Sequence, residues 1–260
     1  MESFADLQAK GDENVVCINK FTSKVQAHII VSQLVGCEYC FKPLVHVDLT
    51  TGEEEKLTIS DFMDCIMKDM IARVSTNPFI SINTAFAEKE LFTVDTRFFA
   101  NAKVLRDFIR NIIDERKANN DPEAFDIISL LLQDENYQNP DDIIDDILVM
   151  FIAGSKTVQN TTSNLITSML HEPEQLKRMR ATIDPYMAEV SDNIMEKMTM
   201  ESVEQMEYVK MAYMEVMRRD APAGMSSTAC MTKDMKIGGI TMYAQEALWI
   251  GIQALHKDPE

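Results

Sequence analysis

The sequence predicts a mainly helical protein with a small sheet near its C-terminal end, and three observations support this fold class. The 260 residues contain only eight glycines and eight prolines, which favours long helices. The segment Asp141–Met169 repeats apolar residues at helical spacing. After Ala221 this spacing ends, and Gly238-Gly239 separates two short apolar runs in the manner of a hairpin.

The segment 141–169 is the element on which the predicted fold depends. Apolar residues on both faces of its first half predict a buried helix, and Asp141 after Pro140 is expected to cap it. The apolar residues are Ile143, Ile144, Ile147, Leu148, Val149, Met150, Phe151 and Ile152. Gly154 lies in the helix interior at a cost of roughly 1 kcal/mol relative to alanine. Two explanations stay open for this glycine, either the close packing of another helix or a flat ligand against the backbone.

Earlier helices are predicted from apolar periodicity and from end signals. They span about residues 25–34, 58–76, 95–117 and 122–132. Gly36 is placed to end the first helix, and Thr58 with Asp61 resembles a capping box at the start of the second. Pro122 is expected at the first position of the fourth helix. Between them, residues 37–56 form either a short strand at LVHVDL or an irregular linker.

Later elements are helices over about residues 172–183, 185–197 and 208–220, followed by a small sheet in which ALWIGIQAL has the length of a buried strand. On the last helix Glu215 and Arg218 are three residues apart, a spacing typical of a solvated ion pair. We expect one domain over residues 1–260. Its parts are an N-terminal helix and linker in 1–56, a helical core in 57–219 and a small β region in 220–260.

Composition limits the function classes. The net charge of -17 argues against nucleic acid or an anionic membrane as partner, because few Lys and Arg are available to neutralise phosphates. The odd count of five cysteines predicts free thiols in an intracellular, reducing compartment. Cys37 and Cys40 form a lone CxxC near His46, which is too few ligands for a structural zinc site, so we expect no metal. The sequence has no run apolar enough to span or anchor to a membrane.

Three segments in fixed order resemble the cytochrome P-450 superfamily of haem-thiolate monooxygenases. Ala153-Gly154-Ser155-Lys156-Thr157 looks like the oxygen-activation motif of the family's long central helix. Glu215-Val-Met-Arg218 is similar to the family's Glu-x-x-Arg helix. The hairpin and the segment that follow this helix in the family resemble IGGITMY and ALHKDPE. The resemblance implies a long central helix and a small C-terminal hairpin or sheet in a P-450-like core truncated at both ends. It also implies that Gly154 and Thr157 match the positions next to haem and dioxygen, and that Glu215 and Arg218 match a structural pair.

The sequence departs from the family in two ways. Lys156 stands where the motif has an acid, and a cation cannot replace a carboxylate as a proton relay. The family's haem iron is held by a cysteine in a loop beyond the position of Glu260, whereas Cys230 lies in TACMTK without such surroundings. We therefore expect no catalytic residue and no cofactor, with haem only if the Cys segment is supplied. We expect this chain to leave the apolar face around Phe151, Gly154 and Val158 open, and we expect other protein subunits to cover that face.

Three hypotheses follow for function. The first, which we favour, is a non-catalytic relative that acts as a structural or interaction subunit of a larger assembly. The second is an incomplete stretch of an active haem-dependent monooxygenase acting on a small apolar substrate. The third is a small-molecule binding module that uses the former pocket.

Overall fold

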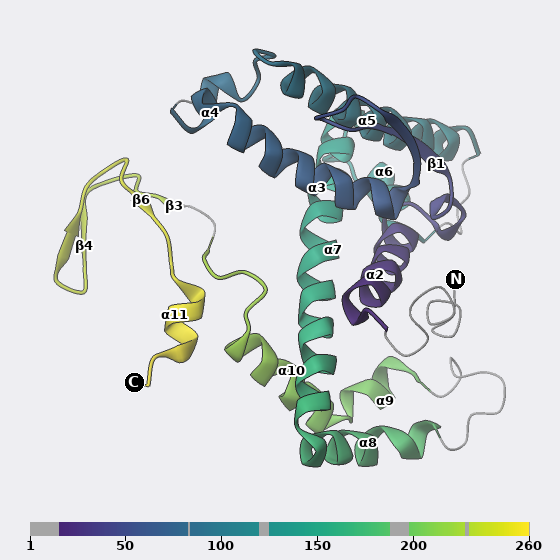
Figure 1. The fold of residues 1–260 in the computed structure, drawn as a ribbon, viewed down its shortest axis with the longest axis vertical. Coiled ribbons are helices and arrows are strands. Elements are labelled where there is room, and N and C mark those ends of the chain that lie inside the picture. Colours follow the sequence, from purple (N-terminus) through teal and green to yellow (C-terminus); the bar gives the residue numbers. More distant parts are fainter. Residues whose placement is uncertain (1–15, 83, 120–124, 188–197, 227–228, 260) are drawn as a thin grey trace. The chain divides into compact units, whose positions relative to one another are not determined.

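The computed structural model describes residues 16–82, 84–119, 125–187, 198–226 and 229–259, and these residues are mostly helical (Figure 1). The longer helices are α2 (Ile18–Leu34), α3 (Ile59–Thr76), α5 (Thr93–Asn119), α7 (Pro140–His171), α8 (Pro173–Met187) and α10 (Glu207–Arg219). The shorter ones are η1 (Cys37–Tyr39), α4 (Pro78–Ile82), η2 (Thr84–Phe86), α6 (Ile127–Gln133), α9 (Met200–Glu204) and α11 (Ile252–Lys257). The strands are β1 (Pro43–Val47), β2 (Glu54–Thr58), β3 (Ala229–Cys230), β4 (Met235–Ile237), β5 (Ile240–Met242) and β6 (Ala247–Leu248).

The strands form three antiparallel pairs, β1 with β2, β3 with β6, and β4 with β5. The predicted mainly helical fold with a small C-terminal sheet region is therefore confirmed. Gly238 and Gly239 join β4 to β5 with φ angles of +54° and +86°. Two successive positive φ angles match the tight hairpin turn that the sequence predicted there.

The chain divides into two compact units. Residues 23–156 form one compact unit, called the first unit below, and residues 1–22 together with residues 157–260 form the second unit. Helices α2 and α7 each run through a boundary and contribute to both units. The single domain over residues 1–260 stays a prediction.

The unit of residues 23–156 is built around one hydrophobic core. Side chains from α2, α3, α5, α6 and the first half of α7 pack together in it, as expected for amphipathic helices. Its largest fully buried members include Phe62, Ile109, Ile113, Ile147 and Phe151. At the surface of the unit, Arg106 and Arg110 of α5 form ion pairs with Asp141 of α7. Aspartates at the start of α7 thus pair with basic side chains, and their negative charges also interact favourably with the positive end of the helix dipole.

The start and the surface of α7 differ from the prediction. Asn139, and not Asp141, caps the helix, because its Oδ1 accepts the backbone N–H of Asp141 at 3.1 Å while Pro140 occupies the first helical turn. The helix is also not buried all round. Val149 is 62% exposed and Met150 is 37% exposed, because the core packs against the opposite side, where Ile144 and Ile147 lie.

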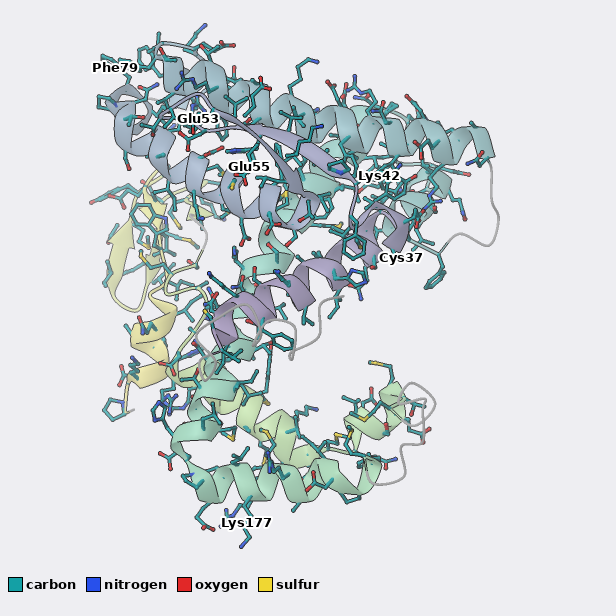
Figure 2. The ribbon with its side chains drawn as sticks, turned by 45° about the vertical axis from the view of Figure 1, so that its right-hand side comes forward. Cys37, Lys42, Glu53, Glu55, Phe79 and Lys177 are labelled. Carbon is teal, nitrogen blue, oxygen red and sulfur yellow. The ribbon has the colours of Figure 1, made fainter. Side chains whose placement is uncertain are left out.

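The N-terminal half contains a helix that ends before a glycine, a helix capped by a threonine, and a strand pair. Gly36 follows the end of α2 with φ +106°, a conformation that strongly favours glycine, as predicted. Thr58 caps α3 by accepting the backbone N–H of Asp61 at 3.3 Å, which confirms the start of this helix, and its hydroxyl donates to the Asp61 carboxylate at 2.9 Å. LVHVDL contains a strand and not a linker, since β1 pairs with β2 in the ribbon where Glu53 and Glu55 lie (Figure 2).

Three predicted elements differ from the structure. Helix α6 begins at Ile127 after the cap of Asp126, while the expected start at Pro122 lies outside the described residues. Helix α8 continues through Pro185 to Met187, although this proline has no backbone N–H to donate. Residues 188–197 lie outside the described part. The segment ALWIGIQAL is not a buried strand. Its strand stops after two residues, and Gly251 precedes the exposed helix α11.

Two buried polar clusters hold the first unit together around α3 and α5. His46 of β1 contacts Asp69 of α3 at 2.8 Å, and the same carboxylate accepts the Asn101 amide of α5 at 3.0 Å. Asn101 also exchanges two hydrogen bonds with the backbone of Val47, at 2.8 and 2.9 Å. His46 is therefore part of a polar cluster that attaches β1 to two helices, a sufficient structural reason for its burial.

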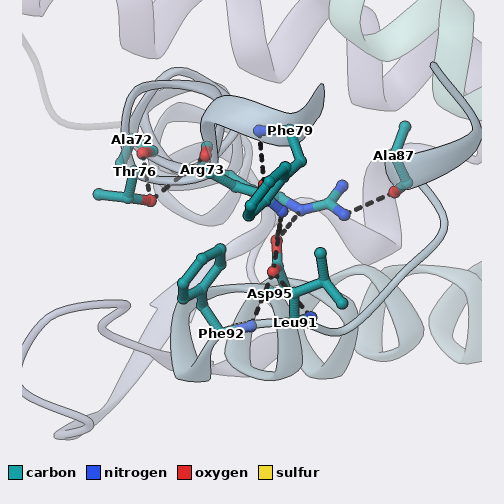
Figure 3. Close-up of polar contacts among 9 residues, drawn as sticks. Ala72, Arg73, Thr76, Phe79, Ala87, Leu91, Phe92 and Asp95 are labelled. Carbon is teal, nitrogen blue, oxygen red and sulfur yellow. Dashed lines mark hydrogen bonds and ion pairs between the residues drawn. The ribbon is translucent and has the colours of Figure 1, made fainter. Parts of the chain in front are cut away.

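The second cluster surrounds Asp95, whose side chain is 0% exposed in the first turn of α5 (Figure 3). Arg73 of α3 donates from Nε to this carboxylate at 2.7 Å, and Asn77 donates its amide at 3.1 Å. The backbone N–H groups of Leu91 and Phe92 donate to the same carboxylate. Burial by itself would raise the pKa of Asp95, but these hydrogen bonds outweigh burial and hold the pKa below its usual value.

Polar contacts also occur in the unit of residues 1–22 and 157–260. The hydroxyl groups of Thr22 and Ser163 lie 2.6 Å apart and are buried. Gln159 of α7 donates its amide to the backbone carbonyl of Asn19 at 3.2 Å. The second half of α7 therefore contacts the first turns of α2 through polar side chains, in contrast to the apolar core of the other unit.

Candidate functional site

Gly154 lies against α2 within the first unit. A Cβ atom at this position would be 3.0 Å from Cδ1 of Ile30, closer than nearly all real Cβ contacts. Gln26, one turn earlier on α2, donates its side-chain amide to the Gly154 carbonyl at 3.2 Å. The glycine thus allows α2 to approach the backbone of α7, which favours the helix-packing explanation of the two that the sequence left open.

We expect Gly154→Leu to lower the free energy of unfolding by about 1–3 kcal/mol, because the larger side chain must displace Ile30 from a packed position. Gly154→Ala should be nearly neutral, since its better helix propensity offsets a small shift of the Ile30 methyl group. Urea unfolding followed by circular dichroism measures both. In an Ile30→Ala background the leucine should cost clearly less. An equal loss in both backgrounds would contradict the packing contact.

Lys156 forms an ion pair with α3. Its Nζ lies 2.6 Å from Oδ1 of Asp64, and the other oxygen of that carboxylate accepts the Ser23 hydroxyl at 3.2 Å. Both side chains of the pair are about one-third exposed, so the pair contributes at most about 1 kcal/mol. The lysine therefore has a structural partner, and a carboxylate introduced at position 156 would face the carboxylate of Asp64.

A charge exchange tests this pairing. Lys156→Asp should lower the free energy of unfolding by about 1 kcal/mol, because it removes the attraction and places two carboxylates together. Asp64→Lys combined with Lys156→Asp should recover at least half of that loss. A double-mutant cycle from denaturant unfolding supplies the coupling energy. Additive single effects would mean that the two side chains do not interact in solution.

Thr157 and Val158 follow on the other side of the unit boundary and are exposed, with Val158 37% exposed. The Thr157 carbonyl accepts the hydroxyl of Thr161 at 2.9 Å. Phe151 is 1% exposed in the core of the first unit. The expectation that Phe151 belongs to an open face is therefore wrong, since α2, α3, α5 and α6 contribute to a core that already covers it. Gly154 is half-buried against α2, so Val158 is the exposed member of the three.

An apolar groove of about 840 Å³ lies beside this part of α7, within the first unit. It is lined by Ile30, Gln33, Leu34, Phe125, Ile127, Leu130, Met150, Ala153 and Gly154. Phe125 is 90% exposed at its edge. Sequence reasoning did not identify the contribution of Phe125 and Leu130, because short apolar runs near a helix start carry the same pattern as ordinary core.

A bound haem needs apolar walls around the porphyrin and a side-chain ligand for its iron. The apolar side chains from α2, α6 and α7 fit one wall of a porphyrin site. No cysteine or histidine is among them. Burial raises the thiol pKa of both Cys40 and Cys65, which disfavours the thiolate form that binds iron. The described residues therefore fit an apolar wall and do not fit the iron ligand.

Glu215 and Arg218 lie together on α10 in the second unit. The guanidinium of Arg218 donates two hydrogen bonds to the Glu215 carboxylate, at 2.6 and 2.7 Å, and a third to the His256 carbonyl at 2.9 Å. The hydrogen bond from Arg218 holds the pKa of Glu215 below its usual value. Both side chains are exposed, which limits the energy of the pair. Through its third bond, Arg218 attaches the end of α11 to α10.

In the part of the chain that the structure describes, no three His, Cys, Asp or Glu side chains group closely enough to bind a metal ion. All five cysteines lie in that part and carry free thiols. Among its helices, none has the length and apolar content needed to cross a lipid bilayer.

Comparison with known proteins identifies the family to which this helical chain belongs. The family model for cytochrome P450 matches residues 13–260, and the chain belongs to this family. Cytochrome P450 71D6 of Solanum chacoense is 29% identical over 168 residues, which cover 58% of this chain and 32% of that protein. The 5-epiaristolochene 1,3-dihydroxylase of Nicotiana tabacum is 26% identical over 143 residues, covering 53% of this chain and 27% of the relative.

A solved structure supports the same fold. The crystal structure of the cytochrome P450DA heme domain matches with a TM-score of 0.73 at 14% sequence identity. The match covers 98% of this chain and 51% of that structure. This chain therefore spans about half of the solved domain, 32% of cytochrome P450 71D6 and 27% of the 5-epiaristolochene 1,3-dihydroxylase.

Proposed function

We propose that this chain supplies the central helical part of a haem-dependent monooxygenase. The observation that carries the proposal is that Ala153 and Gly154 of helix α7, the first two residues of the family-like motif, line an apolar groove. A relative named as a dihydroxylase and a solved neighbour described as a heme domain support the same chemistry. The bound group would supply oxygen activation.

The residues of this chain have a limited role in that proposal. Met150 and Ala153 of α7, with Leu34 of α2 and Leu130 of α6, would form an apolar wall that excludes water from one side of the bound group. The iron ligand would come from a segment outside the residues described. A small apolar substrate is the class that suits such a wall.

Absorption spectroscopy tests the proposal. The polypeptide that carries this sequence, purified from cells supplied with a haem precursor, should show a Soret band that moves on reduction with carbon monoxide as thiolate-ligated haem does. Ala153→Trp should reduce haem content by filling the groove, whereas Val149→Trp, at an exposed position of the same helix, should leave it unchanged. A folded protein without a Soret band would reject the proposal.

A second candidate is the non-catalytic structural subunit, and the Lys156–Asp64 ion pair favours it. An ammonium group donates hydrogen bonds and accepts none, so a lysine held by Asp64 lacks the acceptor oxygen with which a carboxylate takes up and passes on a proton. On this proposal other protein subunits of an intracellular assembly would cover the apolar groove. Co-elution with such subunits, lost in Leu130→Glu and retained in Val149→Glu, together with the absence of a Soret band, would support it.

A further inference from the structure

Cys37 begins the 3₁₀ turn η1 that follows α2 (Figure 2), and Cys40 caps the end of the same turn. The backbone N–H of Cys40 donates to the Cys37 carbonyl at 3.2 Å, which closes the turn. In a 3₁₀ helix, residues three apart are eclipsed and rise about 2.0 Å each, so their Cα atoms lie about 6 Å apart. That separation falls inside the range of roughly 4.4–6.8 Å that disulfides require.

Contacts to α5 hold this turn in place. Tyr39, between the two cysteines, is buried, and its hydroxyl donates to the Glu115 carboxylate at 2.5 Å. Its ring packs edge-on against Phe108, with the ring centroids 6.0 Å apart, and the ammonium group of Lys42 lies 4.1 Å from the centre of the Tyr39 ring. Because the turn is already fixed in this conformation, a bond between the two sulfur atoms needs no large movement of the backbone.

The two thiols have different surroundings. Cys37 is exposed, whereas Cys40 is buried beneath the last turns of α2. The Cys40 sulfur lies 3.5 Å from the Ser32 hydroxyl oxygen and 3.8 Å from the His28 carbonyl oxygen. Burial raises the pKa of the Cys40 thiol, so the sheltered sulfur is the slower nucleophile toward a reagent in solution.

We propose that Cys37 and Cys40 are a redox-active dithiol that small disulfides such as glutathione disulfide oxidise in two steps. In the first step, the Cys37 thiolate attacks the disulfide, forms a mixed disulfide and releases one glutathione. In the second step, the Cys40 thiolate attacks the Cys37 sulfur and releases the second glutathione, leaving an intramolecular disulfide. Two protein thiols are oxidised and one glutathione disulfide is reduced to two thiols, with the two protons passing to the released glutathione. This proposal does not depend on haem chemistry.

Oxidation of the full chain in glutathione buffers, followed by acid quenching, alkylation and mass spectrometry of the tryptic peptide Val25–Lys56, tests the proposal. This peptide contains the two cysteines and no others. In the unmodified chain it should lose both alkylation sites and retain no glutathione. In Cys40→Ser the peptide should retain one glutathione on Cys37, and in Cys37→Ser the remaining Cys40 should react at least tenfold more slowly than Cys37 does in Cys40→Ser.

The other cysteines provide controls, since the exposed Cys17 and Cys230 should each take up glutathione without losing it again. Two outcomes would overturn the proposal. One is a stable glutathione on Cys37 in the unmodified chain, which would mean that Cys40 does not attack it. The other is equal reaction rates for Cys37 and Cys40, which would mean that the sheltered position of Cys40 does not exist in solution.

Discussion

We expect Asp95→Ala to lower the free energy of unfolding by about 3–5 kcal/mol, one of the largest losses for a single substitution in this chain. The alanine leaves the Arg73 guanidinium buried without its carboxylate, and it also removes the acceptor of the Asn77 amide (Figure 3). The two backbone N–H groups before α5 lose their acceptor as well. Urea unfolding followed by circular dichroism measures the loss.

The matched control lies on the same helix. Lys103 and Asp107 form an exposed pair four residues apart, so Asp107→Ala should cost no more than about 0.5 kcal/mol. Acid provides an independent check, since the pKa of Asp95 is lower in the folded chain than its ordinary value of about 3.9. The stabilisation from this group is therefore complete above about pH 4 and is lost as the pH falls through the folded pKa. If both variants lost equal stability, Asp95 would not be a buried ion-pair partner in solution.

Local signals predicted the parts of the fold that depend on a few neighbouring residues. The turns at Gly36 and Gly238-Gly239 were predicted correctly, because a backbone position with a positive φ angle strongly favours glycine whatever the rest of the fold. The cap at Thr58 was predicted correctly, because an N-cap hydrogen bond involves only a backbone N–H of the next helical turn. The cap of α7 was assigned to the wrong residue, since Asn139 and Asp141 are both good caps and only the observed hydrogen bond distinguishes them.

The parts that depend on distant residues could not be predicted. The carboxylate of Asp95 and the guanidinium of Arg73 meet across two helices, and neither residue stands out in an apolar periodicity pattern. Val149 and Phe151 are both apolar and two residues apart, yet one is exposed and the other buried, because burial depends on which side the neighbouring helices occupy.

The candidate site shows the same limit. Glu215 and Arg218 could be placed side by side from their spacing alone, since residues three apart are neighbours on a helix. The partner of Lys156 could not, because Asp64 reaches it from a different helix. The role of Gly154 could be reduced to two explanations, and the choice between them required the position of Ile30.

Phe151→Ala is expected to lower the free energy of unfolding by about 3–5 kcal/mol. The ring is 1% exposed within the core that α2, α3, α5, α6 and α7 share, so its removal leaves a cavity that rigid neighbours fill only in part. Denaturant unfolding followed by circular dichroism measures this loss. Val149→Ala, two residues earlier on the exposed side of the same helix, should change stability by no more than about 0.5 kcal/mol.

This pair of variants also distinguishes a core position from a docking position for Phe151. A residue in an interface between subunits contributes to binding and leaves the stability of the separate chain nearly unchanged when it is truncated. A core residue behaves in the opposite way, because its cavity destabilises the chain whether or not a partner is present. Phe151→Ala should therefore unfold at lower denaturant concentration at every protein concentration used. A loss that appeared only when a partner protein was present would move Phe151 from the core to an interface.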